Sequence, residues 1–223
     1  MNLIVFNNNI SKKYIKIIIA IMLLLAIIPA LFSCGGNKVE NDNVITEATD
    51  INWEERFAND SSEFAKLYPV TADNPFVIAT FDEVMTFFEW GTGVLAFGHP
   101  RCPRCKNAFP ILEKAFTEMN MERYVEFHGR ILYYDIYDDR DENNERYQTL
   151  VELLSDYLIA DDNGDLRIFV PDIYFVGSGR ILGNHRDTVA SVIDPEDPLT
   201  EEQETELLNI YKTLIEKVED CEC

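Results

Sequence analysis

The sequence predicts an α/β protein in which a mixed sheet is flanked by helices. Short apolar runs typical of strands alternate with segments whose apolar residues recur every three or four positions. Gly177-Ser178-Gly179 joins the last two expected strands and indicates a hairpin, after which one more helix follows. The 223 residues, 47% of them hydrophobic, suffice for one well-packed domain with attachments.

The first expected elements are a helix, a strand, a capped helix and a buried strand. Trp53–Tyr68 has loose helical spacing, and Phe76–Ala79 has the composition of a short strand. Thr80 and Glu83 form a capping box, so a helix begins there. Val94–Phe97 is a continuous apolar run, which is typical of a central strand buried on both faces.

The second half of the chain continues the alternation. The expected elements are a helix from Pro103 to about Asn120, a strand at Ile131–Ile136, a helix at Asn143–Leu158 and strands at Asp172–Val176 and Arg180–Leu182. Asn163-Gly164 indicates a plain turn. Thr200 with Gln203 caps a last helix, whose apolar residues lie on one face.

Residues 1–33 are predicted to be a lipoprotein signal peptide. Three lysines precede the 16-residue apolar segment Ile17–Phe32, which is short for a membrane span. Leu31 to Gly35 resembles the lipobox of bacterial lipoproteins, which implies cleavage before Cys34 and diacylglycerol on its thiol. The alternative is an uncleaved anchor helix with an incidental cysteine. Both interpretations put the rest of the chain outside the cytoplasm, on the outer face of the cell membrane.

The expected mature chain is strongly acidic. The net charge is −21, and loss of the three leader lysines leaves 16 basic and 40 acidic side chains, a net charge of −24. Such a surface repels nucleic-acid phosphates and anionic lipid head groups, so nucleic acid is excluded as a partner held by charge. Residues 34–50 are polar and aperiodic, as in a flexible tether, and residues 51–223 form the domain, with a core at about 75–220.

With Cys34 assigned to lipid, four cysteines remain, in one C-x-x-C and one C-x-C. This close spacing is typical of redox or metal chemistry rather than of disulfides that link distant loops. Cys221 and Cys223 can form a second redox pair that exchanges electrons with Cys102 and Cys105, a passive terminal disulfide, or half of a four-thiolate metal site. Pro103-Arg104 at a helix start suits exchange better than zinc, so we expect no metal and no cofactor.

Cys102 and Cys105 are the candidate catalytic residues. Cys102 directly precedes the expected helix, where free backbone N–H groups favour a thiolate and lower its pKa. Cys105 lies about one turn further on, near enough to resolve a mixed disulfide. Arg101, Arg104 and His99 form a basic cluster that either stabilises the thiolate or extends into solvent with little effect.

Three further features give this segment a resemblance to the thioredoxin superfamily. Pro110 lies eight residues after Cys102, Val170-Pro171 directly precedes a strand, and Gly179 lies eight residues after Pro171. The resemblance covers roughly residues 75 to 220. It implies a thioredoxin fold, Cys102 as nucleophile, Cys105 as resolving thiol, and Val170 with a cis Pro171 as the substrate-binding element. Thioredoxin-like lipoproteins and bacteriocin-transport-accessory-type proteins of Gram-positive bacteria are the most similar members.

The sequence departs from thioredoxin proper at several positions. Ala96 stands where the family has a buried aspartate that assists proton transfer, and Arg101 stands where it has a tryptophan. Asp172 follows the expected cis-proline, so its charge is expected to face the sulfurs. About 25 extra residues, chiefly Tyr137–Arg167, form a helical insertion before Pro171, where we expect partner choice to lie.

The sequence therefore predicts a membrane-tethered extracytoplasmic thiol–disulfide oxidoreductase that acts on protein thiols and disulfides. A transmembrane electron-carrier protein is a further possible partner, and the direction, oxidising or reducing, is left open. Two alternatives are a redox-inert binding module for secreted partners and a cysteine-based metal site.

Overall fold

The computed structural model describes residues 52–121 and 129–221. Its main sheet has five strands in the order β1-β3-β2-β6-β7. The strands are β1 (Phe76–Ile78), β2 (Gly93–Gly98), β3 (Ile131–Asp135), β6 (Asp172–Gly177) and β7 (Arg180–Arg186). The first three are parallel, whereas β6 runs antiparallel to β2 and to β7. The predicted α/β class with a mixed sheet is confirmed.

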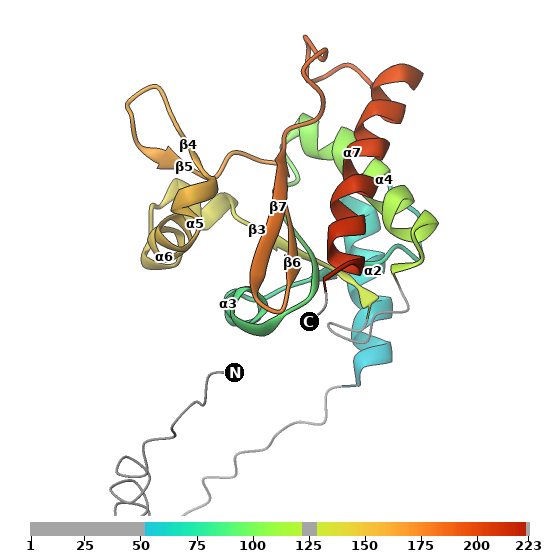
Figure 1. Ribbon diagram of the computed structural model, residues 1–223, viewed down its shortest axis with the longest axis horizontal. Helices are drawn as coiled ribbons and strands as arrows, with labels where there is room; N and C mark the ends of the chain where they lie inside the picture. The colour runs from blue at the N-terminus through green and yellow to red at the C-terminus, as the bar shows by residue number, and fades with distance from the viewer. Residues whose placement is uncertain (1–51, 122–128, 222–223) are drawn as a thin grey trace, which may run out of the picture. The chain divides into compact units, whose positions relative to one another are not determined.

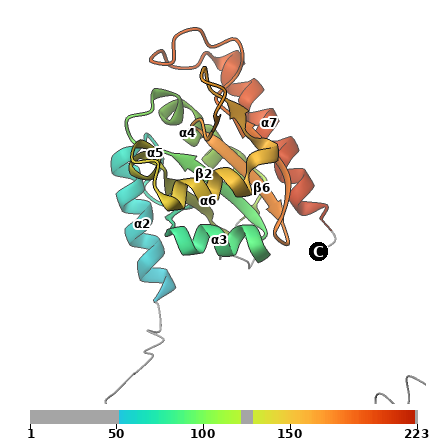
Figure 2. The ribbon, with the colours of Figure 1, turned by 90° about the vertical axis from the view of Figure 1, so that its left-hand side faces the viewer.

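Helices cover both faces of this sheet (Figures 1 and 2). One face packs on α2 (Trp53–Leu67), α4 (Pro103–Glu118) and α7 (Glu201–Glu219), and the other packs on α3 (Phe81–Trp90) and α6 (Glu145–Leu153). Side chains of β2 and β6 alternate between the two cores, and both strands are buried along their whole length. Burial on both faces explains why β2 is a continuous apolar run in the sequence.

Both predicted capping boxes are present. The Thr80 hydroxyl accepts a hydrogen bond from the Glu83 N–H at the start of α3, and the Glu83 carboxylate accepts one from the Thr80 N–H. Thr200 and Gln203 make the same reciprocal contacts at the start of α7. Each box satisfies two backbone N–H groups that would otherwise have no partner inside the helix.

The insertion is more varied than the single helix predicted for Asn143–Leu158. A short helix, α5 (Tyr137–Asp141), precedes α6, and a 3-10 turn at Ser155–Tyr157 leads into a two-stranded hairpin. Its strands are β4 (Ile159–Ala160) and β5 (Leu166–Arg167), and the expected Asn163-Gly164 turn joins them. The Asp161 carboxylate closes this turn by accepting hydrogen bonds from the backbone N–H groups of Asn163 and Asp165.

The tip of the β6–β7 hairpin lies tightly against the end of α3. Gly179 has φ +74° and donates its N–H to the Gly91 carbonyl at 2.8 Å. A Cβ added at Gly179 would lie 2.2 Å from the Glu89 carbonyl oxygen. This position therefore requires glycine both for its backbone conformation and for space.

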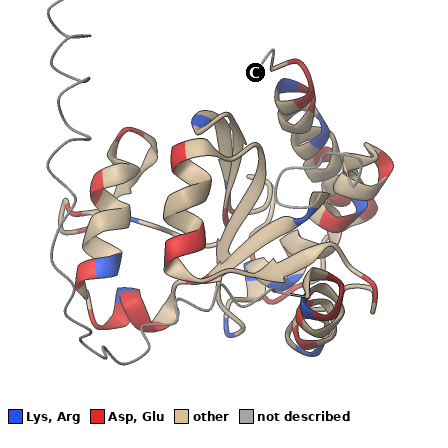
Figure 3. Ribbon diagram, turned by 90° about the horizontal axis from the view of Figure 1, so that it is seen from below, with Lys and Arg blue, Asp and Glu red and all other residues tan. Residues whose placement is uncertain are grey.

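Acidic residues are spread over the helices of the domain (Figure 3). Among the described helices, α2, α3 and α7 each begin with acidic residues in the first turn, where they favour the helix dipole. By contrast, α4 has no acidic residue in its first turn. Helix α4, which begins directly after Cys102, therefore has no carboxylate of its own in the first turn that would repel a thiolate at Cys102.

Candidate active site

Cys102 is the N-cap residue of α4, directly beyond the end of β2. Its sulfur accepts a hydrogen bond from the Cys105 N–H at 3.1 Å and lies 3.5 Å from the Val170 carbonyl, to which the thiol donates. Cys102 is 6% exposed, and Cys105, one turn into the helix, is fully buried. Both cysteines are free thiols. The structure thus brings together the two segments that the sequence singled out, Cys102 to Cys105 and Val170-Pro171.

The two thiols have opposite pKa shifts. The pKa of Cys102 is lowered, first by the hydrogen bond from the Cys105 thiol and then by the backbone N–H groups of Cys105 and Arg104, against an opposing effect of burial. Burial raises the pKa of Cys105 strongly, and the neighbouring Cys102 raises it further. Cys102 is therefore the thiol that ionises first and the better nucleophile, while the Cys105 thiol remains protonated.

The Val170–Pro171 peptide bond is cis, as the resemblance implied. The Pro171 carbonyl accepts the N–H of Asp187 at 2.8 Å, and Asp187 adopts φ +73°. The Asp187 carboxylate pairs with Arg104, and its charge raises the pKa of Cys102. Asp187 could not be predicted as a site residue from the sequence, because no local pattern shows that the end of β7 returns to the first turn of α4.

The basic residues around the dithiol make other contacts. Arg104 pairs with Asp187, and Arg101 donates to the Tyr137 hydroxyl at 2.9 Å while lying over its ring. Burial lowers the pKa of His99, so its imidazole is neutral at neutral pH. The main groups that lower the pKa of Cys102 are the Cys105 thiol and the helix N–H groups. These contacts favour the second interpretation of the cluster, in which its basic groups contribute little to thiolate stability.

Asp172 does not face the sulfurs, contrary to the expectation. It is fully buried on the other face of the sheet, where its carboxylate accepts hydrogen bonds from Tyr174, Asn184 and Arg186 at 2.9–3.3 Å. Burial raises its pKa to about 6, although Arg186 opposes the shift. The expectation failed because Asp172 is the first residue of β6, where side chains alternate between the faces, and Ile173 takes the face of the thiols.

Ala96 lies fully buried in the same core cluster as both cysteines. Apart from the two thiols, the ionisable groups of this cluster are tyrosines. The hydroxyls of Tyr68 and Tyr133 lie 2.9 Å apart, and burial raises the pKa of both. The buried hydroxyl of Tyr211 has no hydrogen-bond partner within the described part of the chain. These hydroxyls stay protonated at neutral pH, so none of them acts as a base beside the dithiol.

Cys221 lies at the far end of the sheet from the dithiol. A Cβ added at Gly177, the last residue of β6, would lie 2.6 Å from the Cys221 sulfur, whereas Pro171 precedes the first residue of that strand. Six strand residues span about 17 Å, so Cys221 cannot share a metal ion with Cys102. No group of metal-ligating side chains occurs within residues 52–121 and 129–221. Cys221 is disulfide-bonded, and Cys34 and Cys223 lie outside the described residues.

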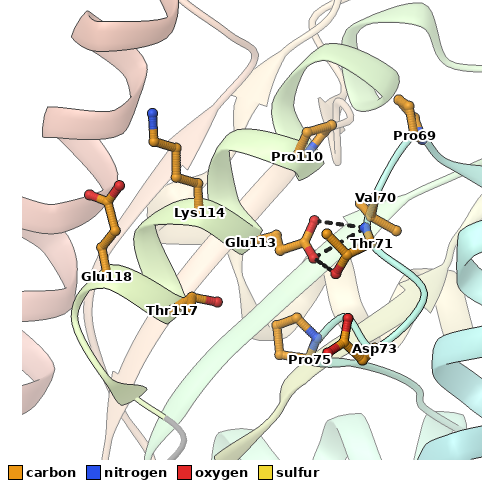
Figure 4. Close-up of a pocket in the computed structure, with 10 residues that line it drawn as sticks. All are labelled: Pro69, Val70, Thr71, Asp73, Pro75, Pro110, Glu113, Lys114, Thr117 and Glu118. Atoms are coloured by element: carbon orange, nitrogen blue, oxygen red, sulfur yellow. Dashed lines mark hydrogen bonds between the residues drawn. The ribbon is translucent and has the colours of Figure 1, made fainter.

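Two of the pockets that α4 lines lie at different places on its surface. One of about 530 Å³ adjoins the dithiol and is lined by Arg104, Ile159, Phe169, Val170, Arg186 and Asp187. A second, of about 780 Å³, lies between the middle of α4 and the segment before β1 (Figure 4). There, the Glu113 carboxylate accepts the Thr71 N–H at 3.2 Å. Of these two pockets, the first is the one lined by Val170, whose carbonyl accepts a hydrogen bond from the Cys102 thiol.

No protein-family model, curated protein or solved structure matches this chain. Among the described residues, no helix is both long enough and apolar enough to span a bilayer. The signal peptide, the tether and the lipidation site at Cys34 fall in residues that the structure does not describe. The chemistry of the dithiol and its surroundings is therefore the basis on which a function is assigned.

Proposed function

We propose that this chain is a thiol–disulfide oxidoreductase of the thioredoxin superfamily that acts on protein disulfides. The observation that carries the proposal is the asymmetry of the dithiol: a nucleophilic Cys102 at a helix start and a buried, proton-holding Cys105 behind it. The cis peptide bond before Pro171, next to the Cys102 sulfur, supports it. The closing β6–β7 hairpin and helix α7 support the thioredoxin fold.

The reaction, written for reduction, has two steps. The Cys102 thiolate attacks one sulfur of a substrate disulfide, forms a mixed disulfide and releases the other substrate sulfur as a thiolate, which takes up a proton. Cys105 then gives up its proton and attacks Cys102. This step closes the Cys102–Cys105 disulfide and releases the second substrate thiol. A dithiol donor must reduce the enzyme again, and oxidation of a substrate is the same sequence in reverse.

Substitution of each cysteine tests the proposal. Cys102→Ser is expected to abolish the reduction of insulin by dithiothreitol above the uncatalysed rate, because the nucleophile is lost. Cys105→Ser keeps the nucleophile but cannot resolve the intermediate, so it should accumulate a mixed disulfide visible by mass spectrometry. Unchanged insulin reduction by Cys102→Ser would refute the proposal.

A redox-inert binding module is the second candidate, and the low exposure of the thiols is the observation that favours it. Cys102 is 6% exposed and Cys105 is fully buried. Thiol labelling separates the two functions. An oxidoreductase must expose Cys102 often enough to react with iodoacetamide within minutes at neutral pH, whereas a locked site would leave both cysteines unlabelled after mild reduction.

The site of action that we propose is the outer face of the cell membrane, through lipid on Cys34. Its support is the signal-like leader and the lipobox resemblance of Leu31 to Gly35. In a detergent phase-partition experiment on cell extracts, the native protein is expected in the detergent phase and Cys34→Ala in the aqueous phase. Equal partition of the two proteins would refute lipid attachment.

A further inference from the structure

One wall of the pocket beside the dithiol is formed by the insertion between β3 and β6. Val170, Arg104 and Asp187 belong to segments next to Cys102. Ile159 comes from β4, in the hairpin that ends the insertion. Figure 1 shows this hairpin at the margin of the domain, on the other side of the main sheet from most of α4 and α7, while Ile159 lines the same pocket as Arg104 at the start of α4. The insertion thus reaches the place where a substrate chain must lie when Cys102 attacks it.

The insertion exposes an unusual share of apolar side chains. Seven large hydrophobic residues of the described chain are exposed, and four of them lie between residues 153 and 166. These four are Leu153, Tyr157, Ile159 and Leu166. Ile159, at 52% exposure, lines the pocket together with half-buried Phe169. Of the four, Ile159 is the one that lines the pocket. An exposed apolar side chain beside a hollow that is also lined by a second apolar residue marks a place where another molecule binds.

The charges of the pocket are already paired. The Arg186 guanidinium is held by buried Asp172 at 3.1 Å and by the Tyr157 carbonyl at 2.6 Å, so it ties the insertion to β6. Arg104 is held by Asp187. An occupant therefore need not bring an anion to neutralise these arginines, and the strongly acidic chain disfavours an acidic partner.

We propose that this pocket is a subsite that receives a large apolar side chain lying within two residues of the cysteine that Cys102 attacks in a partner protein. The proposal rests on the function proposed above and names the feature by which that site selects its substrates. Ile159 and Phe169 form the apolar walls, and Val170 connects the pocket to the thiol. Burial of one leucine-sized side chain there is expected to speed the attack by about tenfold.

Peptides that carry one cysteine, blocked as a mixed disulfide with thionitrobenzoate, test the subsite. Each peptide has Leu or Ser at one of the two positions on either side of the cysteine. The protein, with Cys102 and Cys105 reduced and the Cys221 disulfide intact, is mixed with each peptide. Cys102 attack on the peptide sulfur releases thionitrobenzoate, which is measured by absorbance. At one position, the Leu peptide is expected to react about tenfold faster than its Ser counterpart.

Two variants in the same hairpin locate the effect. Ile159→Ser is expected to reduce the Leu-to-Ser rate ratio to near one. Leu166→Ser is the matched control, because it removes an exposed apolar side chain from the opposite face of the hairpin and should keep the wild-type ratio. If the two variants unfold at the same temperature, the changed rate ratio in Ile159→Ser does not result from a loss of stability.

The outcomes separate this proposal from the one on which it rests. A ratio near one at every position in the wild type, or an unchanged ratio in Ile159→Ser, overturns the subsite alone. Failure of the protein to release thionitrobenzoate even from its adduct with free cysteine, with no difference between wild type and Cys102→Ser, overturns the oxidoreductase function and the subsite with it.

Discussion

The side chains around Cys102 determine how far the pKa of its thiol falls. The two arginines that flank the thiol in the sequence are engaged elsewhere, and one of them is neutralised by Asp187. Asp187 is itself fixed by its N–H bond to Pro171 and by the hydrogen bonds from the Thr188 N–H and hydroxyl. This carboxylate limits how far the pKa of Cys102 falls.

Asp187→Asn is therefore expected to lower the pKa of Cys102, because it removes a nearby negative charge and frees Arg104. Asparagine tolerates the left-handed backbone at this position. Below the pKa, iodoacetamide should react roughly two- to fivefold faster, as for a partly exposed charge pair worth ~0.5–1 kcal/mol. Asp162→Asn, which removes an exposed carboxylate from the β4–β5 turn, is the control. A slower reaction in Asp187→Asn would contradict the assignment.

Asp172 predicts a pH dependence of stability. Its pKa is raised from 3.8 to about 6 in the fold, so the folded state favours the protonated carboxyl. That contribution is fully present below pH 3.8 and is lost as the pH rises through about 6. Relative to Asp172→Asn, the wild type should lose on the order of 2 kcal/mol of unfolding free energy between pH 4 and pH 7. Urea titrations at several pH values measure this difference, and an opposite slope would show that Asp172 is ionised throughout.

At the level of helices and strands, local signals determine where elements begin, and α3 is the clearest case. Its capping box joins Thr80 and Glu83, and Glu83 also accepts Arg56 of α2 at 2.9 Å, so the cap connects two helices. The same box at Thr200 begins α7. The start of each helix is encoded within four consecutive residues, so both starts can be predicted from the sequence.

Thr80→Ala is expected to lower the free energy of unfolding by about 1 kcal/mol, because the Glu83 N–H loses its partner. Thr213→Ala is the matched control at an exposed position inside α7, where alanine is neutral or slightly favourable. Chemical denaturation of the two variants compares them directly. Equal losses in both would show that the threonine contributes through helix propensity and not through the cap.

The sequence predicted the five strands of the main sheet and the flanking helices, because each has its own periodicity or cap. It missed the β4–β5 hairpin, since two-residue strands carry no alternation to detect. It also misplaced Asp172, because the face that a strand residue takes depends on register. Asp187 and Ile159 reach the site only through tertiary contacts, and no local pattern carries that information.

At the scale of the whole domain, the sheet separates two kinds of cysteine. Cys102 and Cys105 lie beyond the end of β2, and Cys221 lies beside the last residue of β6, which runs antiparallel to β2. The length of β6, about 17 Å, rules out direct exchange between them within one molecule in this conformation. The second of the three interpretations of the tail, a passive disulfide, fits this distance best.

Cys221→Ser is expected to leave the redox potential of the Cys102–Cys105 pair unchanged, because Cys221 lies beside Gly177, at the end of β6 far from the dithiol. Titration of both proteins against glutathione buffers, followed by mass spectrometry of the active-site peptide, measures this. A shift of about 30 mV or more, a tenfold change in the equilibrium constant, would indicate that the tail exchanges electrons with the dithiol.

The β6–β7 and β4–β5 hairpins also differ in how far their turns tolerate substitutions and insertions. Gly179 leaves no room for even one methyl group at the β6–β7 tip, whereas a Cβ added at Gly164 in the β4–β5 turn meets no atom within 4 Å. Exposed turns of the second kind accept extra residues, while closed tips do not. Related chains can therefore differ in the length and sequence of the β4–β5 turn. Such differences would change the edge of the pocket without changing the dithiol or the structure around it.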